Sequence, residues 1–146
     1  MSHRSRIEER IDSTAESVRN ALKRTTRALA ERGACPREIE STEVVLAELM
    51  NNVVEHAYLG QPGRSICLRV DILDDSLSCH VVDDGLALPG LAPPPVHRHD
   101  FNVDLEDLPE GGFGWTLIQD LTCELGYVRS NGQNHVSFCI CRNRTA

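Results

Sequence analysis

The sequence contains a single lysine, Lys23, which stands far from every cluster of glycines. A Walker-type phosphate loop needs a lysine directly after its last glycine, so the chain has no such loop. It also has no apolar run that approaches the length of a membrane span. We therefore expect no P-loop nucleotide site and no association with a membrane.

None of the six cysteines stands in a C-x-x-C pair, so the usual spacing of a structural zinc site is missing. We expect reduced, mostly buried thiols in a cytoplasmic protein, because residues 1–12 are charged throughout and carry no secretory leader. The formal net charge of −7 leaves no basic footprint for phosphates, so direct binding to nucleic acid is not expected. The acidic body suits a basic partner instead.

The pattern of apolar residues and turn residues predicts one domain, 1–146, made of short alternating elements. Residues 3–11 are either an edge strand or a frayed terminus. Helices are predicted over 14–31, 36–58 and 113–122, and strands over 64–73, 77–82, 123–130 and 135–142. This order favours an α/β (α+β) two-layer sandwich, with the helices on one face of a mixed sheet. The long segment between the third helix and the strand before it is rich in proline and glycine, which is typical of a functional or mobile loop.

The stretch VVLAELMNNVVEHAY, residues 44–58, places polar side chains along one stripe of a helix. Leu46 and Met50 share the apolar side, whereas Glu48 and Asn52 lie opposite, with His56 near their edge. Such a stripe is usually a solvated face. Asparagine is nevertheless a poor mid-helix residue, and an amide oxygen four residues from a carboxylate could hold a hard cation such as Mg²⁺.

Two further patterns follow along the chain. An apolar strand runs directly into Asp83, Asp84 and Gly85, which taken alone is an ordinary strand-ending turn. Gly112 and Gly114 then open an amphipathic helix, an arrangement that brings backbone N–H groups and a helix dipole against a phosphate. A glycine-rich helix entrance is weak evidence by itself.

Together and in this order, the patterns are far more specific. E-x-x-x-N-x-x-x-H-A, then D-x-G at a strand end, then G-x-G-x-x-L-I opening a helix, resembles the gyrase, heat-shock chaperone, histidine-kinase and MutL (GHKL) ATPase superfamily. The spacing and the compact length look most like its serine-kinase anti-sigma factors, and the likeness extends from about residue 14 to residue 141. The resemblance implies a Bergerat-type ATP-binding fold that uses ATP and Mg²⁺.

The resemblance assigns roles to the first motif residue by residue. Glu48 matches the catalytic carboxylate, the general base toward a substrate hydroxyl. Asn52 matches the asparagine that binds Mg²⁺, and His56 matches a position near the phosphates. Phosphoryl transfer needs a positioned base and a metal that neutralises phosphate oxygens, so a helix with both on one wall agrees with this assignment.

The later motifs receive roles in the same way. Asp83 matches the aspartate that hydrogen-bonds the adenine amino group, and Gly85 lets the backbone pass close to the nucleotide. Gly112 and Gly114 match the second glycine motif, whose amides face the phosphates, with Thr116 nearby. Residues 88–112 match the mobile lid over the nucleotide.

Four departures from the family pattern stand out. Ala87 occupies the place of the second glycine in D-x-G-x-G, and a methyl group there can impair close approach to the nucleotide. Glu110 is acidic where a basic residue is common, and Arg98 is the only arginine in the lid. Asn134-His135 replaces a common Gly-Thr before the last strand, so adenine-side hydrogen bonding is expected to differ.

The leading hypothesis is an anti-sigma factor with serine/threonine kinase activity. It would bind a sigma factor or an analogous regulator, phosphorylate a STAS-type antagonist and act as a homodimer. The alternative is a catalytically weak or inactive binding module of the same fold that sequesters a regulator. A third and weaker hypothesis is an orphan ATPase module of a sensor kinase.

Two other residue groups have plain structural interpretations. His97 and His99 could ligate a metal, but a polar lid is the simpler interpretation because no further ligand clusters with them. Trp115 could stack on a nucleotide or partner, but a core or lid-supporting aromatic fits its place at the helix entrance better.

Overall fold

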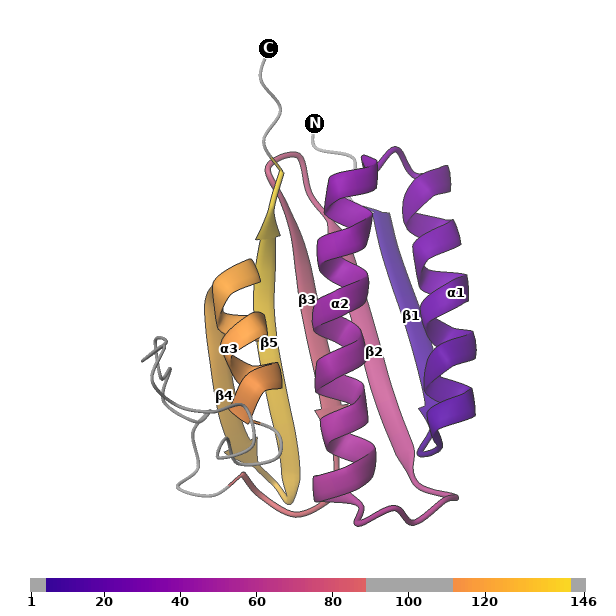
Figure 1. Cartoon of the computed structure of the whole chain (residues 1–146), viewed down its shortest axis with the longest axis vertical. Helices are drawn as coiled ribbons and strands as arrows, with labels where there is room; N and C mark the ends of the chain where they lie inside the picture. Colours follow the sequence, from indigo (N-terminus) through magenta and orange to yellow (C-terminus); the bar gives the residue numbers. More distant parts are fainter. Residues whose placement is uncertain (1–4, 89–111, 143–146) are drawn as a thin grey trace.

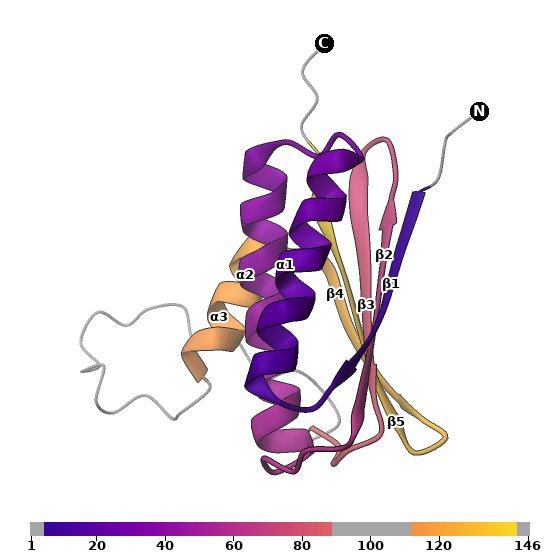
Figure 2. The ribbon, with the colours of Figure 1, turned by 90° about the vertical axis from the view of Figure 1, so that its right-hand side faces the viewer.

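A computed structural model of the chain describes residues 5–88 and 112–142. Three helices cover one face of a five-stranded sheet, as the two views at right angles show (Figures 1 and 2). The elements follow the order β1 (Ser5–Asp12), α1 (Ala15–Glu31), α2 (Pro36–Asn52), the π-helical segment η1 (Val53–Ala57), β2 (Ser65–Ile72), β3 (Ser76–Asp83), α3 (Gly112–Leu121), β4 (Cys123–Ser130) and β5 (Gln133–Cys141). The predicted two-layer α+β sandwich is confirmed, and the first segment is an edge strand.

The sheet has the strand order β1-β2-β3-β5-β4, and every neighbouring pair is antiparallel. The predicted mixed sheet is therefore wrong. Two successive helices, α1 and α2, return the chain to the end where β1 finished, so β2 runs against β1 (Figure 1). The single helix α3 makes β3 and β4 run the same way, but β5 lies between them and opposes both.

Local signals start the helices where the sequence predicts. Thr14 caps α1 by accepting a hydrogen bond from the backbone N–H of Ser17 at 3.1 Å. Glu38 caps α2 by accepting from the N–H of Cys35 at 2.8 Å. The second helix was predicted to continue to residue 58, and it does so by changing to a π turn after Asn52. Such π segments are frequent at functional sites.

The core lies between the helices and the inner face of the sheet. The predicted apolar side of α2 is buried, since Leu46 and Met50 are fully inaccessible. Alternate residues of β2 point inward, among them Ile66 and Val70, while Arg69 points outward and is exposed. This period-2 pattern fixes the register of the strand, because a one-residue slip would turn its apolar side chains toward solvent.

The expectation of mostly buried thiols is wrong. Of the six cysteines only Cys79 is buried; Cys35, Cys67, Cys123 and Cys141 are exposed, Cys139 is half-buried, and all are free. The helices cover one face of the sheet only, so cysteines on its other face remain accessible (Figure 2).

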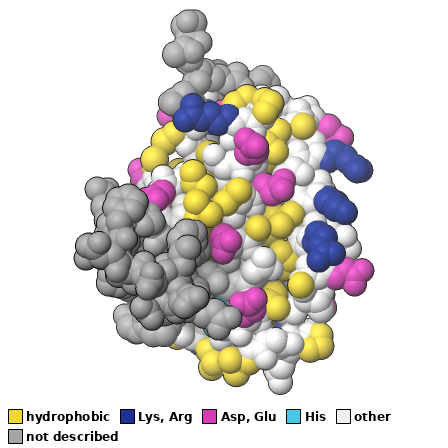
Figure 3. All heavy atoms as spheres, viewed as in Figure 1, with side chains coloured by type: hydrophobic (Ala, Val, Ile, Leu, Met, Phe, Trp, Pro, Cys, Tyr) yellow, Lys and Arg dark blue, Asp and Glu magenta, His cyan; other side chains and the backbone are white. Residues whose placement is uncertain are grey.

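Within the described residues, no helix is both long and apolar enough to cross a membrane. Most of the basic side chains visible on the helical face lie along its α1 edge, whereas acidic side chains are spread across it (Figure 3). Acidic side chains are therefore more widely distributed than basic ones on this face.

Candidate functional site

Helix α2 carries the first group of candidate residues. Glu48 and Asn52 are half-buried and lie one turn apart on α2. The Nδ2 atom of Asn52 is buried, and it has no hydrogen-bond partner within the described part of the chain. A buried amide group without a partner is costly, and it commonly marks a ligand or water position. The residue that the sequence picked out as a poor helix former is thus also unsatisfied in the fold.

His56 lies beyond α2, in the π-helical segment. A π turn contains more residues than an α turn, so His56 is rotated away from the straight line through Glu48 and Asn52. Its side chain is 56% exposed, and its Nε2 lies 3.8 Å from a carboxylate oxygen of Glu55. The single polar stripe predicted from a continuous α-helix is therefore bent at its end.

The second group surrounds Asp83, the last residue of β3. Asp83 is only 4% exposed. Its Oδ1 accepts hydrogen bonds from Asn134 Nδ2 at 2.8 Å and from the backbone N–H of Gly85 at 2.9 Å. Burial raises the pKa of Asp83, against the effect of these hydrogen bonds and of the Arg129 charge. No hydrogen bond within the described residues uses Oδ2, so one carboxylate oxygen is left to accept from a ligand.

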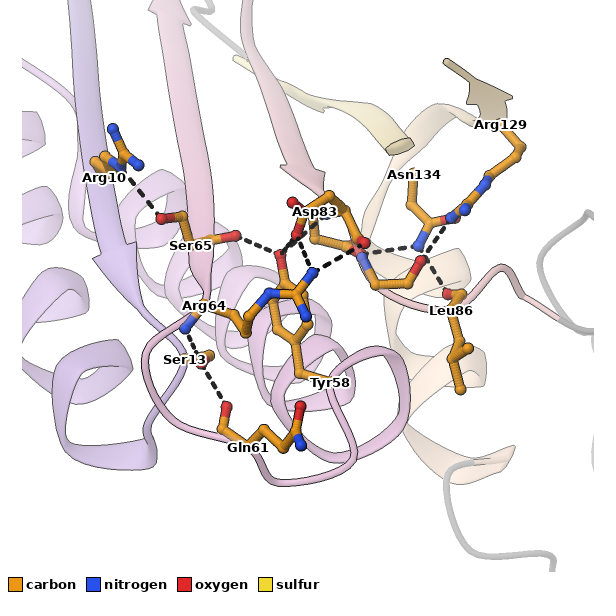
Figure 4. A network of polar contacts seen from close by, with 12 residues as sticks. Arg10, Ser13, Tyr58, Gln61, Arg64, Ser65, Asp83, Leu86, Arg129 and Asn134 are labelled. Atoms are coloured by element: carbon orange, nitrogen blue, oxygen red, sulfur yellow. Dashed lines mark hydrogen bonds and ion pairs between the residues drawn. The ribbon is translucent and has the colours of Figure 1, made fainter. Parts of the chain in front are cut away.

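Asn134 is the centre of this polar group, directly across the sheet from Asp83. Its Nδ2 also donates to the carbonyl of Leu86 at 2.8 Å, and its Oδ1 accepts from Arg129 at 3.0 Å and from the Tyr127 hydroxyl. Figure 4 shows Asn134 between Asp83 and Arg129. Both ends of the amide are engaged, which fixes the orientation of the asparagine and of the carboxylate that it holds.

Gly85 follows Asp83 by two residues and passes very close to the end of the π-helical segment. A Cβ at this position would lie 2.7 Å from the carbonyl carbon of Ala57. The next residue, Leu86, donates its N–H to the carbonyl oxygen of Ala57 at 2.9 Å. The absence of a side chain at Gly85 therefore allows the segment after β3 to lie against the end of η1. Ala87 is exposed.

The second member of the acidic pair has a different environment. Asp84 accepts hydrogen bonds from the Tyr58 hydroxyl at 2.8 Å and from Arg64 at 3.0 Å. These bonds lower its pKa, while burial raises the pKa of Tyr58 to about 12. The Arg64 guanidinium also lies over the Tyr58 ring, 5.0 Å from its centroid. Asp84 thus anchors the loop before β2 to the end of β3.

The third group lies on α3, which packs against α2. Gly112 and Gly114 belong to its first turn, as predicted, and Thr116 is half-buried. Trp115 is 7% exposed, so the interpretation of this residue as a core aromatic is confirmed. Nearly all of the predicted lid, including Arg98 and the positions of His97, His99 and Glu110, lies outside the described residues.

The fold brings the three groups onto one set of neighbouring elements. The helix with Glu48 and Asn52 continues into the π segment that the exit of β3 touches, and α3 packs on the same helix. Among the described residues, no group of three or more His, Cys, Asp or Glu side chains could hold a metal ion. Mg²⁺ can instead be bound through one or two protein oxygens together with substrate phosphates, and Asn52 offers such an oxygen.

Sequence reasoning missed three contributors to the site. Tyr58, Tyr127 and Arg129 hold the two aspartates or their partners, and none belongs to a recognised motif. Asn134 was noted only as a departure from a family pattern. The glycine turn at 131–132 predicts the hairpin of β4 and β5, but it does not say which strand β5 pairs with next.

The fold and the D-x-G strand exit place the chain among the nucleotide-binding ATPase and kinase domains. Residues 11–140 match the family described as Histidine kinase-like ATPase domain. The chain is 32% identical over 130 residues to the Serine-protein kinase RsbW of Bacillus cereus, and 31% identical over 130 residues to that of Bacillus mycoides. Each alignment covers 87% of this chain and 79% of the relative. The chain therefore belongs to the histidine kinase-like ATPase family and, within it, to the group of the RsbW serine-protein kinases.

A solved structure has the same architecture. The crystal structure of the RsbU and RsbW domains of Rv1364c from Mycobacterium tuberculosis superposes with a TM-score of 0.65 over 94% of this chain. The two sequences are 18% identical, and this chain spans 33% of that longer chain. The likeness therefore supports the fold.

Proposed function

We propose that the chain is an anti-sigma factor with serine/threonine protein kinase activity. In this proposal it binds ATP with Mg²⁺ and phosphorylates a serine of a STAS-domain antagonist in a partner-switching system. The observation that carries the proposal is the way Asp83 is held, with one oxygen occupied and the other available at the end of β3. Kinship with serine-protein kinases supports the reaction class.

Asp83 is the proposed adenine acceptor. The amino group of adenine is a hydrogen-bond donor, and an ionised carboxylate is the stronger acceptor for it. The hydrogen bonds from Asn134 and Gly85 and the charge of Arg129 favour the ionised form, against the effect of burial. The protein thus keeps an acceptor in a buried place, where a base can be recognised without competition from water.

Asn52 is the proposed magnesium ligand. Its buried, unpartnered amide agrees with a group that is satisfied only when a ligand is bound. The nitrogen and oxygen of an amide exchange places on a flip, so the same side chain can turn its oxygen to the metal. His56 would lie near the phosphates, and the backbone amides of Gly112 and Gly114, with Thr116 nearby, would bind phosphate oxygens from α3. Residues 88–112 would close over the nucleotide.

Glu48 is the proposed general base. It would accept the proton of the substrate serine as the hydroxyl oxygen attacks the γ-phosphorus and ADP leaves. Its place one turn before Asn52 puts the base and the metal ligand on the same helix, so the backbone of α2 sets their separation. A rigid helix holds such a pair more accurately than a loop does.

The proposed partners follow from kinship. They are a STAS-type antagonist, which is the substrate, and a sigma factor or an analogous regulator, which the protein sequesters. We expect a homodimer in the cytoplasm that contacts neither nucleic acid nor a membrane. Light scattering at micromolar concentration would test the dimer, and a monomer would contradict it.

A second candidate function is a catalytically weak or inactive module of the same fold. The observation that favours it is Ala87, which stands where the family motif has a second glycine. Ala87 is exposed, so its methyl group does not by itself obstruct the packing of the described residues. The two candidates differ in phosphate transfer and can share nucleotide binding.

The test has two stages, each with a neighbouring control on the same helix. Calorimetric titration with ATP should show magnesium-dependent binding that Asn52→Ala weakens and Asn51→Ala, at an exposed neighbour, leaves intact. Transfer of labelled phosphate to the STAS antagonist should then be lost in Glu48→Ala, with ATP binding retained, and kept in Glu43→Ala, at an exposed residue of α2. ATP binding without any transfer by the wild type would favour the inactive module. Undiminished transfer by Glu48→Ala would refute its role as the base.

A further inference from the structure

Two exposed cysteines meet at one end of the β4–β5 hairpin. Cys123 is the first residue of β4 and Cys141 is the last residue of β5. Their Sγ atoms lie 3.0 Å apart, and both residues are exposed and free. A disulfide has a sulfur–sulfur distance of about 2.05 Å, so the two atoms need to approach by only about 1 Å to bond.

We propose that Cys123 and Cys141 are a redox-sensitive pair that forms a reversible disulfide within the chain when it meets a peroxide. The thiolate of one cysteine attacks a peroxide oxygen, the O–O bond breaks, and the released hydroxide takes up a proton to become water. The resulting sulfenic acid is attacked by the sulfur of the second cysteine. The S–O bond breaks, and the departing hydroxide leaves as water with the proton of the second thiol. Two thiols lose two electrons in total, and hydrogen peroxide is reduced to two molecules of water.

The neighbouring cysteines are less suited to this reaction. Cys79 is buried, and burial raises the pKa of its thiol strongly, so it supplies no accessible thiolate. Cys139 is half-buried, and its Sγ lies 3.6 Å from a carboxylate oxygen of Glu124. Burial and this carboxylate raise the pKa of Cys139, and contact with Cys123 raises the pKa of Cys141 as well, so exposure and the sulfur–sulfur contact, not the pKa, distinguish the pair. Solvent exposure and the contact between the Sγ atoms together favour Cys123 and Cys141 as the reactive pair.

The place of the pair in the fold gives the bond a structural consequence. Cys123 follows α3 after one residue, and Cys141 precedes Arg142, whose buried guanidinium pairs with Glu38 near the start of α2. A disulfide would therefore join the end of α3 to the strand end that is fixed to α2. It lies at the opposite end of α3 from the glycines of its first turn. This proposal is independent of kinase activity, because it concerns the thiols alone.

The experiment uses the full chain, reduced with dithiothreitol, desalted and then treated with hydrogen peroxide. The remaining thiols are alkylated in denaturant and counted by mass spectrometry, before and after renewed reduction. We expect two of the six thiols to be lost on oxidation and recovered on reduction. Trypsin cuts after Arg98, Arg129 and Arg142, so Cys123 falls in peptide 99–129, whereas Cys139 and Cys141 both fall in peptide 130–142. The two peptides should be linked in the wild type.

Single substitutions identify the partner. The link should persist in Cys139→Ser and in the control Cys67→Ser, and disappear in Cys141→Ser and Cys123→Ser. A link that survives Cys141→Ser and is lost in Cys139→Ser would overturn the proposal, as would full alkylation of all six thiols after oxidation. Oxidising a mixture of ¹⁴N- and ¹⁵N-labelled protein separates bonds within a chain from bonds between chains, and mixed-isotope linked peptides would also overturn it.

Discussion

Replacing Gly85 by alanine tests how the candidate site is assembled. The added methyl group would lie 2.7 Å from the carbonyl carbon of Ala57, a separation that side chains in folded proteins do not tolerate. Either the exit of β3 or the end of the π-helical segment must move. The hydrogen bond from the Leu86 N–H to the carbonyl of Ala57 spans the same contact, so it should lengthen or break.

The magnitude follows from two opposing effects. Overpacking of this kind costs about 1–3 kcal/mol, whereas alanine reduces the entropy of the unfolded chain and returns about 0.4–1 kcal/mol. The net loss of stability should be about 1–2 kcal/mol. The matched control is Gly126→Ala, because a Cβ there would meet only the Ser137 hydroxyl oxygen at 3.5 Å, an ordinary contact.

Thermal unfolding followed by circular dichroism measures the difference. A domain of this size loses about 2–4 °C of Tm for each kcal/mol, so Gly85→Ala should melt about 2–8 °C below the wild type, with Gly126→Ala near or above it. ATP affinity should fall in Gly85→Ala as well, because the displaced loop carries the N–H that holds Asp83. If Gly85→Ala has the same Tm as the wild type and binds ATP equally well, the close contact with Ala57 does not shape the site.

Three further predictions concern charge and hydrogen bonding. Asn134→Ala removes one of the two donors to Asp83 Oδ1, so calorimetry should show ATP affinity falling at least ~10-fold, about 1.4 kcal/mol; unchanged affinity would contradict the positioning role. In the wild type, ATP affinity should fall as the pH drops through the raised pKa of Asp83, because the protonated carboxyl is a poorer acceptor, and this loss should begin at a higher pH than for an ordinary aspartate. Arg142→Met should lower stability by about 3–5 kcal/mol in urea titrations, because it leaves Glu38 charged and buried. Adding Glu38→Leu should recover part of that loss, since it removes the unpaired charge but also the cap on α2. A double variant no more stable than the single one would refute this account.

The pH dependence of stability provides a second test of the ion pair between Glu38 and Arg142. Burial alone would raise the pKa of Glu38, but hydrogen bonds from the Cys35 N–H and from Arg142 outweigh it, and the pKa is lowered. A lowered pKa contributes stability above the unfolded-state value, and this contribution is lost as the pH falls through the folded-state value. The raised pKa of Asp83 acts in the other direction, since its contribution is lost as the pH rises.

Most of the elements could be predicted from the sequence because their signals are local. The cap at Thr14, the alternation of β2 and the turn at 131–132 each depend on residues close together in the chain. The antiparallel pairing of all the strands could not be predicted, because it depends on β5 lying between β3 and β4. The period of an isolated strand does not say which neighbours it will have.

The candidate site also contains residues that local sequence patterns identify and residues that only the fold brings together. Motif spacing was enough to propose Glu48, Asn52 and Asp83 as site residues, because the residues of each motif lie close together in the chain. The partner that orients Asp83 is 51 residues away, and it meets Asp83 only through the register of β3 with β5. Exposure of the cysteines was mispredicted for a related reason, since a single sequence does not say which face of a sheet the helices will cover.

The two aspartates at the end of β3, Asp83 and Asp84, have different roles that a single carboxylate could not combine. Asp84 has a lowered pKa and accepts from Tyr58 and Arg64, so it ties the strand exit to the loop that follows the π-helical segment. Asp83 is more deeply buried, has a raised pKa and keeps one oxygen without a partner among the described residues. A carboxylate saturated by internal donors would hold the fold and offer a ligand little. Because Asp84 supplies the anchorage, Asp83 can remain partly unsatisfied in a buried position, which is what its proposed role in recognising adenine requires.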